Sequence, residues 1–162
     1  MFSNNKEEIS FKERSRLLFA QVDLLKENLY MDLLERFKQD PTVGEHERKW
    51  KLSILVASIS TALFSKSLIR NKEYPTLYTY FIIKINEFDS EGEAAIEDCM
   101  GLIADLMNRT EYDPIQFTDT IALWLYFQIR GKEELNLEET APYMLVAQFI
   151  NNNFFNWFDE SE

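Results

Sequence analysis

The feature that most constrains the fold is a run of apolar and small side chains in the first half of the chain, residues 54–64 (ILVASISTALF). A helical period extends it on both sides, through Trp50, Ile54, Ala57, Thr61, Phe64 and Leu68. A helix without a polar face has to be buried. We therefore predict a central helix over approximately residues 45–70, in which small residues such as Ala57 permit close approach of neighbouring helices.

The same run is too short to cross a membrane. Its uncharged stretch, residues 52–65, covers 14 residues, whereas a bilayer requires roughly 18 or more apolar residues. The first residues of the chain lack the apolar stretch of a secretory signal. The single cysteine, Cys99, fits a reducing compartment. We expect a cytoplasmic protein without membrane contact.

Periodic apolar residues and capping patterns predict further helices around the central one. A capping box at Ser10–Glu13 begins the first helix, which should end near Pro41. A second capping box at Thr42–Glu45 opens the central helix. The other predicted helices cover residues 74–88, 93–109, 113–130 and 136–154. Residues Thr76–Ile83 also have strong β propensity, so helix and strand remain alternatives there, with periodicity favouring the helix.

The predicted fold class is all-α. Four glycines and four prolines in 162 residues provide few of the tight turns that β-sandwiches and barrels need. A chain of this length suits one domain with one core. We expect residues 1–162 to form a compact single-domain bundle of about six helices around the buried central helix, with residues 1–9 and 159–162 as disordered tails.

The net charge of −11 is distributed unevenly. Residues 1–90 hold 14 Lys/Arg and 13 Asp/Glu, whereas residues 91–162 hold 3 Lys/Arg and 15 Asp/Glu. An acidic surface repels phosphate backbones, which argues against direct binding of nucleic acid. It attracts basic proteins by long-range electrostatics. Glu91, Asp98 and Asp105 recur every seven residues, with Glu97 beside them, and are predicted to bind a basic partner; the alternative is a solvated helix face.

The last predicted helix carries an excess of aromatic residues. Residues 149–158 contain five of them, too many for a single inward face. Trp157 and Phe158, beside an acidic tail, are predicted to anchor an interface, with core packing as the alternative. Self-association as a homodimer is the simplest use of such a surface.

Residues suited to catalysis or metal binding are sparse. His46 and Cys99 fall in different predicted helices, and the Glu-x-x-His pair of di-iron bundles is absent. The closest glycines, Gly92 and Gly101, are too far apart for a phosphate-binding loop. Asp119 lies in an otherwise apolar segment and is the candidate residue for an active site built from carboxylates alone. We therefore predict no catalytic residues, no metal and no cofactor.

The function predicted from these observations is that of a non-catalytic, acidic helical protein. It would bind a basic protein partner as an inhibitor, immunity or regulatory factor. Two alternatives stay open. The first is a helical bundle that encloses an apolar small molecule, suggested by an aromatic cluster at residues 74–81. The second is an enzyme with an unrecognised carboxylate or metal site, for which Asp119, His46 and Glu97 are the first candidates.

Overall fold

The computed structural model describes residues 2–64, 68, 71–109, 114–131 and 134–159. Within these ranges it contains helices and no strand, so the predicted all-α bundle is confirmed. The described residues form seven α-helices, one of them a single turn, and one 3-10 helix. In chain order they are α1 (Phe2–Arg36), α2 (Pro41–Gly44), α3 (Glu47–Leu63), α5 (Tyr74–Phe88), α6 (Gly92–Arg109), α7 (Pro114–Arg130), η1 (Leu137–Glu139) and α8 (Ala141–Phe154).

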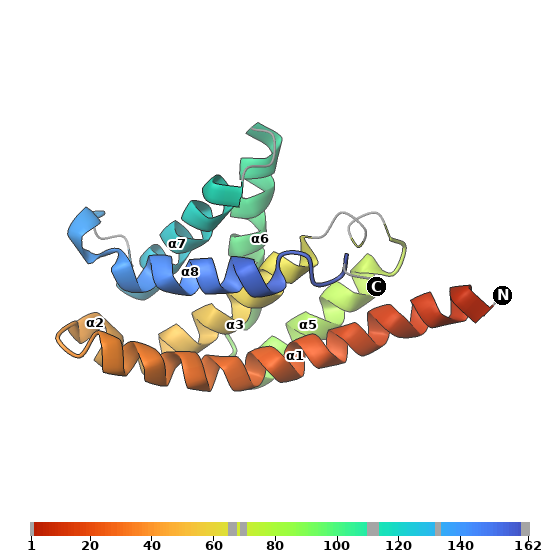
Figure 1. Cartoon of the computed structure of the whole chain (residues 1–162), viewed down its shortest axis with the longest axis horizontal. Coiled ribbons are helices and arrows are strands. Elements are labelled where there is room, and N and C mark those ends of the chain that lie inside the picture. The colour runs from red at the N-terminus through yellow and green to blue at the C-terminus, as the bar shows by residue number, and fades with distance from the viewer. Residues whose placement is uncertain (1, 65–67, 69–70, 110–113, 132–133, 160–162) are drawn as a thin grey trace.

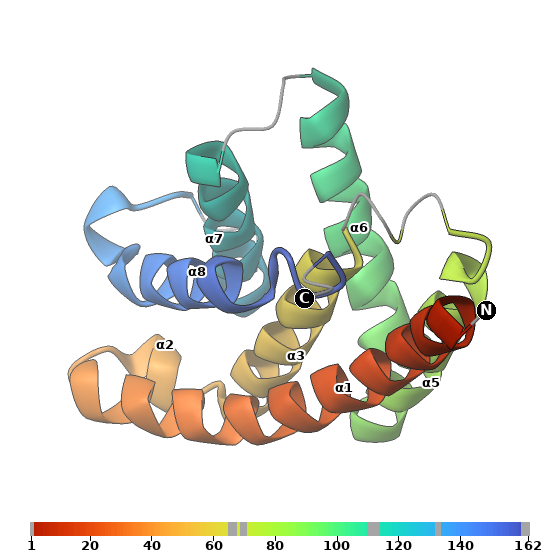
Figure 2. The same ribbon diagram turned by 45° about the vertical axis from the view of Figure 1, so that its right-hand side comes forward.

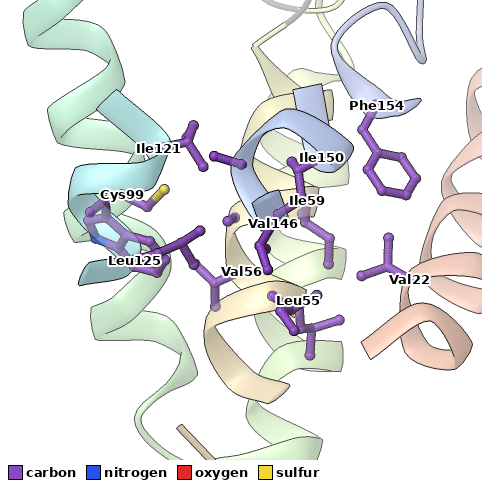
Figure 3. Close-up of a cluster of buried hydrophobic side chains, with 14 of the residues drawn as sticks. Val22, Leu55, Val56, Ile59, Cys99, Ile121, Leu125, Val146, Ile150 and Phe154 are labelled. Carbon is purple, nitrogen blue, oxygen red and sulfur yellow. The ribbon is translucent and has the colours of Figure 1, made fainter. Parts of the chain in front are cut away.

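Helix α3 occupies the centre of the bundle, as the apolar run predicts. Every residue from Leu52 to Leu63 is buried. The helix contacts α1, α5, α6, α7 and α8, and the two ribbon views show it enclosed by them (Figures 1 and 2). Figure 3 shows α3 side chains meeting those of α1, α6, α7 and α8 in one hydrophobic cluster. None of the helices in the described ranges is long and apolar enough to span a membrane.

Helix α1 lies along one side of the bundle (Figure 1). Its inner face buries an apolar stripe formed by Leu18, Val22, Leu29 and Leu33. The helix begins at Phe2, so the prediction that Ser10 caps it was wrong. Residues 2–9 contain neither proline nor glycine, and nothing in the sequence stops the helix from extending past the capping pattern.

The link between α1 and α3 also differs from the prediction. Asp40, and not Thr42, caps a helix here, because its carboxylate accepts a 2.9 Å hydrogen bond from Thr42 N and Pro41 occupies the first turn of α2. The central helix then starts at Glu47. Trp50 Nε1 donates to Thr42 O at 3.0 Å and thereby ties this turn to α3.

Helix α5 resolves the ambiguity between helix and strand over Thr76–Ile83 in favour of the helix. Leu77, Phe81 and Ile85 face inward, at the four-residue spacing of one helical face. The start of α6 packs directly on this helix, since a Cβ atom at Gly92 would lie 2.3 Å from Ile85 Cγ2. A residue without a side chain is therefore needed at Gly92.

Candidate interaction groove

Helices α7 and α8 and the η1 segment enclose a groove of about 290 Å³ that opens to solvent. The buried rings of Tyr126 and Tyr143 belong to its lining, and they meet edge to face with centroids 5.0 Å apart. Tyr143 also stacks on Trp50 of α3 at 5.0 Å, which joins the groove to the central core. The lining residues are Asp119, Ala122, Leu123, Tyr126, Leu135, Leu137, Thr140, Tyr143 and Met144.

Large apolar side chains remain exposed at this groove. Leu137 is 78% exposed, and Leu123 and Leu135 are each exposed by more than a third. Phe127 follows Leu123 by one helical turn on α7 and is also exposed. Clustered exposed apolar residues indicate an interaction site more strongly than the same residues scattered singly.

The segment that carries Leu135 and Leu137 is fixed by hydrogen bonds. The Tyr126 hydroxyl donates to Glu134 O at 3.2 Å and accepts from Asn136 N at 3.0 Å. The Asn136 side chain accepts from Glu138 N at 3.0 Å and so caps η1. The two leucines are thus held outward on an ordered scaffold.

Carboxylates surround the groove. Asp119 lines it from α7, and Glu134 and Glu138 flank the two leucines; all three are exposed. Glu139 instead forms an ion pair with Arg130. The Arg130 guanidinium lies 5.0 Å from the centre of the Tyr126 ring, a cation–π contact. Arg130 is therefore engaged within the fold, while Asp119, Glu134 and Glu138 face solvent beside the groove.

The predicted acidic residues lie on or next to α6, the neighbouring helix: Glu91 directly precedes it, and Glu97, Asp98 and Asp105 lie within it. Glu91, Glu97, Asp98 and Asp105 are all exposed. Asp98 Oδ2 accepts hydrogen bonds from Trp124 Nε1 at 2.9 Å and Gln128 Nε2 at 3.4 Å, so this side faces α7. Glu97 faces the opposite side, toward α5, where burial and the negative charge of Glu97 raise the pKa of Tyr78. Glu97 and Asp98 therefore face different sides of α6.

The predicted aromatic anchors pack mainly within the chain. Phe158 is 2% exposed, and its ring lies 6.0 Å from that of Phe11 on α1. Trp157 Nε1 donates to Arg14 O at 3.0 Å, and Arg14 Nη1 donates back to Trp157 O at 3.3 Å. Phe158 consequently offers little surface to a partner, and residues 157 and 158 pack against α1.

The candidate reactive residues lie apart in the fold. Cys99 is fully buried on α6, and this burial raises the pKa of its thiol to about 12, so the nucleophilic thiolate is suppressed at neutral pH. His46 precedes α3, whereas Asp119 is exposed at the groove. In the part of the chain that the structure describes, no three His, Cys, Asp or Glu residues are grouped to hold a metal ion.

Sequence periodicity missed the leucines of the groove because they lie between α7 and α8, in a segment without α-helical periodicity. The signal that could have found them is the pattern of residues 133–139, EELNLEE, in which two leucines alternate with polar residues among four glutamates. Comparison with known proteins adds no candidate residue: no protein-family model matches the sequence, and neither curated proteins nor solved structures give a significant match.

Proposed function

We propose that this chain is a non-catalytic binding protein whose acidic second half engages a basic protein partner, as an inhibitor, immunity or regulatory factor. The observation that carries the proposal is the combination of exposed leucines and exposed carboxylates at the α7–η1–α8 groove. An apolar centre with a charged rim is the usual composition of a protein interface. Carboxylates alone are equally common on solvated helices.

The charge distribution supports a basic partner. From residue 91 onward the sequence holds 15 acidic and 3 basic residues, and one of the basic residues, Arg130, is paired with Glu139. Opposite charge on the partner would raise the rate of association, and salt would reduce this effect. The buried, protonated thiol of Cys99 supports a role without covalent catalysis.

The test is affinity capture from a lysate of the source organism at low salt, with the wild-type chain and two charge-reversal variants. Glu134→Lys combined with Glu138→Lys changes two exposed residues of the acidic half that flank the groove leucines. Asp32→Lys combined with Glu35→Lys makes the same change in net charge on exposed positions of α1. This second variant is the matched control.

We expect the wild-type chain and the α1 control to retain the same basic protein, and rising salt to release it. The variant of the acidic half should lose most of this protein while keeping its Tm. Equal retention by both variants, or capture of an acidic protein that salt does not release, would contradict the proposal.

A further inference from the structure

We propose that the α7–η1–α8 groove binds the apolar face of an amphipathic, basic helix of the partner protein. This inference rests on the proposed function and specifies the segment that the acidic half recognises. In this arrangement one or two large apolar side chains of the helix enter the groove between Leu123 and Leu137. Lysine or arginine side chains next to them lie over the carboxylates of the rim.

The size of the groove favours side chains over a separate small molecule. Its volume of about 290 Å³ lies just below the range of roughly 300–1,000 Å³ that is typical of small-molecule sites. Its lining is almost wholly aliphatic and aromatic, with Asp119 and the Thr140 hydroxyl as the polar side chains besides the tyrosines. A helix with apolar side chains spaced three or four residues apart can place them in a groove of this kind.

Hydrogen bonds hold the η1 wall of the groove in place, as expected of a preformed docking site. Thr140 Oγ1 donates to Leu137 O at 3.0 Å, and the Tyr126 hydroxyl holds Glu134 and Asn136 on the other side. These bonds keep Leu137 exposed instead of letting it fold into the core. A preorganised site loses less conformational entropy on binding.

The exposed carboxylates beside the groove favour a basic helix as its occupant. Asp119 stands on α7 at one wall, and Glu134 and Glu138 stand beside Leu135 and Leu137 at the other. A neutral or acidic helix would bring no charges to balance these carboxylates. A helix with cations flanking its apolar face pairs with them while it buries the leucines.

A second exposed apolar surface provides the comparison for a test. Leu17, Leu24 and Met31 recur every seven residues on the outer side of α1, and we call them the α1 stripe. Leu24 is 64% exposed and Met31 is 63% exposed. Met144 lines the groove, so labelled methionine methyl groups report on both surfaces separately.

The experiment titrates the full chain, labelled with ¹³C at its methionine methyl groups, with two synthetic peptides. The first is an amphipathic helical peptide of leucine and lysine. In the second, each leucine is replaced by alanine, which preserves the charge and the helix propensity. Affinities are measured in parallel by fluorescence anisotropy for the wild-type chain and for Leu137→Gln and Leu24→Gln, two neutral changes at exposed positions.

We expect the leucine–lysine peptide to shift the Met144 methyl signal and to leave Met31 unchanged. Leu137→Gln should weaken its binding about tenfold, because apolar area buried at Leu137 is lost, and Leu24→Gln should leave binding unchanged. Binding of the two peptides with equal affinity and no shift of Met144 would overturn the groove site but leave the acidic-surface proposal standing. A shift of Met31 with a matching loss in Leu24→Gln would assign the apolar site to the α1 stripe and overturn the inference as well.

Discussion

The indole nitrogen of Trp124 donates a hydrogen bond of 2.9 Å to Asp98 Oδ2, which joins α7 to α6. Trp124 is 3% exposed, so its N–H group reaches no bulk water in the folded state. Asp98 is at the same time an exposed member of the acidic face of α6. It therefore has a structural role in addition to any role in binding, and its replacement affects both.

Replacement of Asp98 by alanine should destabilise the fold by about 1–3 kcal/mol, because the buried N–H group of Trp124 loses its acceptor. Asp98→Asn retains an acceptor oxygen and should cost less. Glu97→Ala is the control: it is exposed on the same helix and should change stability by less than about 0.5 kcal/mol. Urea unfolding followed by Trp fluorescence measures all three, and equal values for Asp98→Ala and Glu97→Ala would refute the structural role.

The local sequence was sufficient to predict the fold class, because the spacing of apolar residues identifies most of the helices and their buried faces. The stripe from Leu18 to Leu33 and the run around Ile59 each define a buried helix face without knowledge of the partners. The helix ends that were placed wrongly depend on competition between neighbouring residues. Asp40 and Thr42 both precede plausible first turns, and the choice between them rests on Pro41 and on contacts with Trp50.

The groove could not be predicted in the same way because it depends on how α7, η1 and α8 pack together. Asp98 and Trp124 are both visible as residue types, but their hydrogen bond depends on how α6 and α7 pack. Leu135 and Leu137 lie in a segment without helical period, and the Tyr126 hydroxyl positions that segment. Phe158 was predicted to lie at an interface but is buried. An aromatic-rich sequence is compatible with both exposure and packing, and only the contact with Phe11 distinguishes them.

The thiol of Cys99 should react with disulfide reagents only when the chain unfolds. Burial raises its pKa from the ordinary 9.0 to about 12, so at pH 8 the folded protein holds almost no thiolate. We expect the labelling rate with dithiobis-nitrobenzoate to follow the unfolded fraction as urea is added. Rapid labelling of the native protein at pH 8 would show that the thiol is accessible and would contradict its place in the core.

The same shift predicts that stability falls at alkaline pH. Well below pH 9 the thiol is protonated in both states, and Cys99 contributes no pH dependence. Between about pH 9 and 12 the unfolded chain releases the proton and the folded chain keeps it, so unfolding becomes more favourable as pH rises. Cys99→Ala should reduce this loss of stability, measured by urea unfolding at pH 8 and pH 10.5. An unchanged pH dependence in the variant would contradict the prediction.

Tyr126→Phe should loosen the segment that presents Leu135 and Leu137. The change removes the hydroxyl that donates to Glu134 O and accepts from Asn136 N, at a cost of about 1–2 kcal/mol in stability. Hydrogen exchange at the Asn136 amide should accelerate more than exchange in the core. Tyr30→Phe, which removes a 2.8 Å bond to Val43 O elsewhere in the bundle, should leave Asn136 unaffected. Equal exchange at Asn136 in both variants would show that Tyr126 does not hold the segment.

Variants of Phe158 and Trp157 test whether these aromatic residues pack within the chain or form an interface between chains. Phe158→Ala removes a buried ring that lies against Phe11, and it should lower stability by up to about 3 kcal/mol. Trp157→Phe keeps most of the apolar surface but loses the hydrogen bond to Arg14 O, so a smaller loss of about 1 kcal/mol is expected. Thermal unfolding and analytical ultracentrifugation should show a lower Tm for both variants and an unchanged mass in solution. An unchanged Tm together with loss of a dimer would return these residues to the role of interface anchors, because their contacts would then stabilise the assembly and not the single chain.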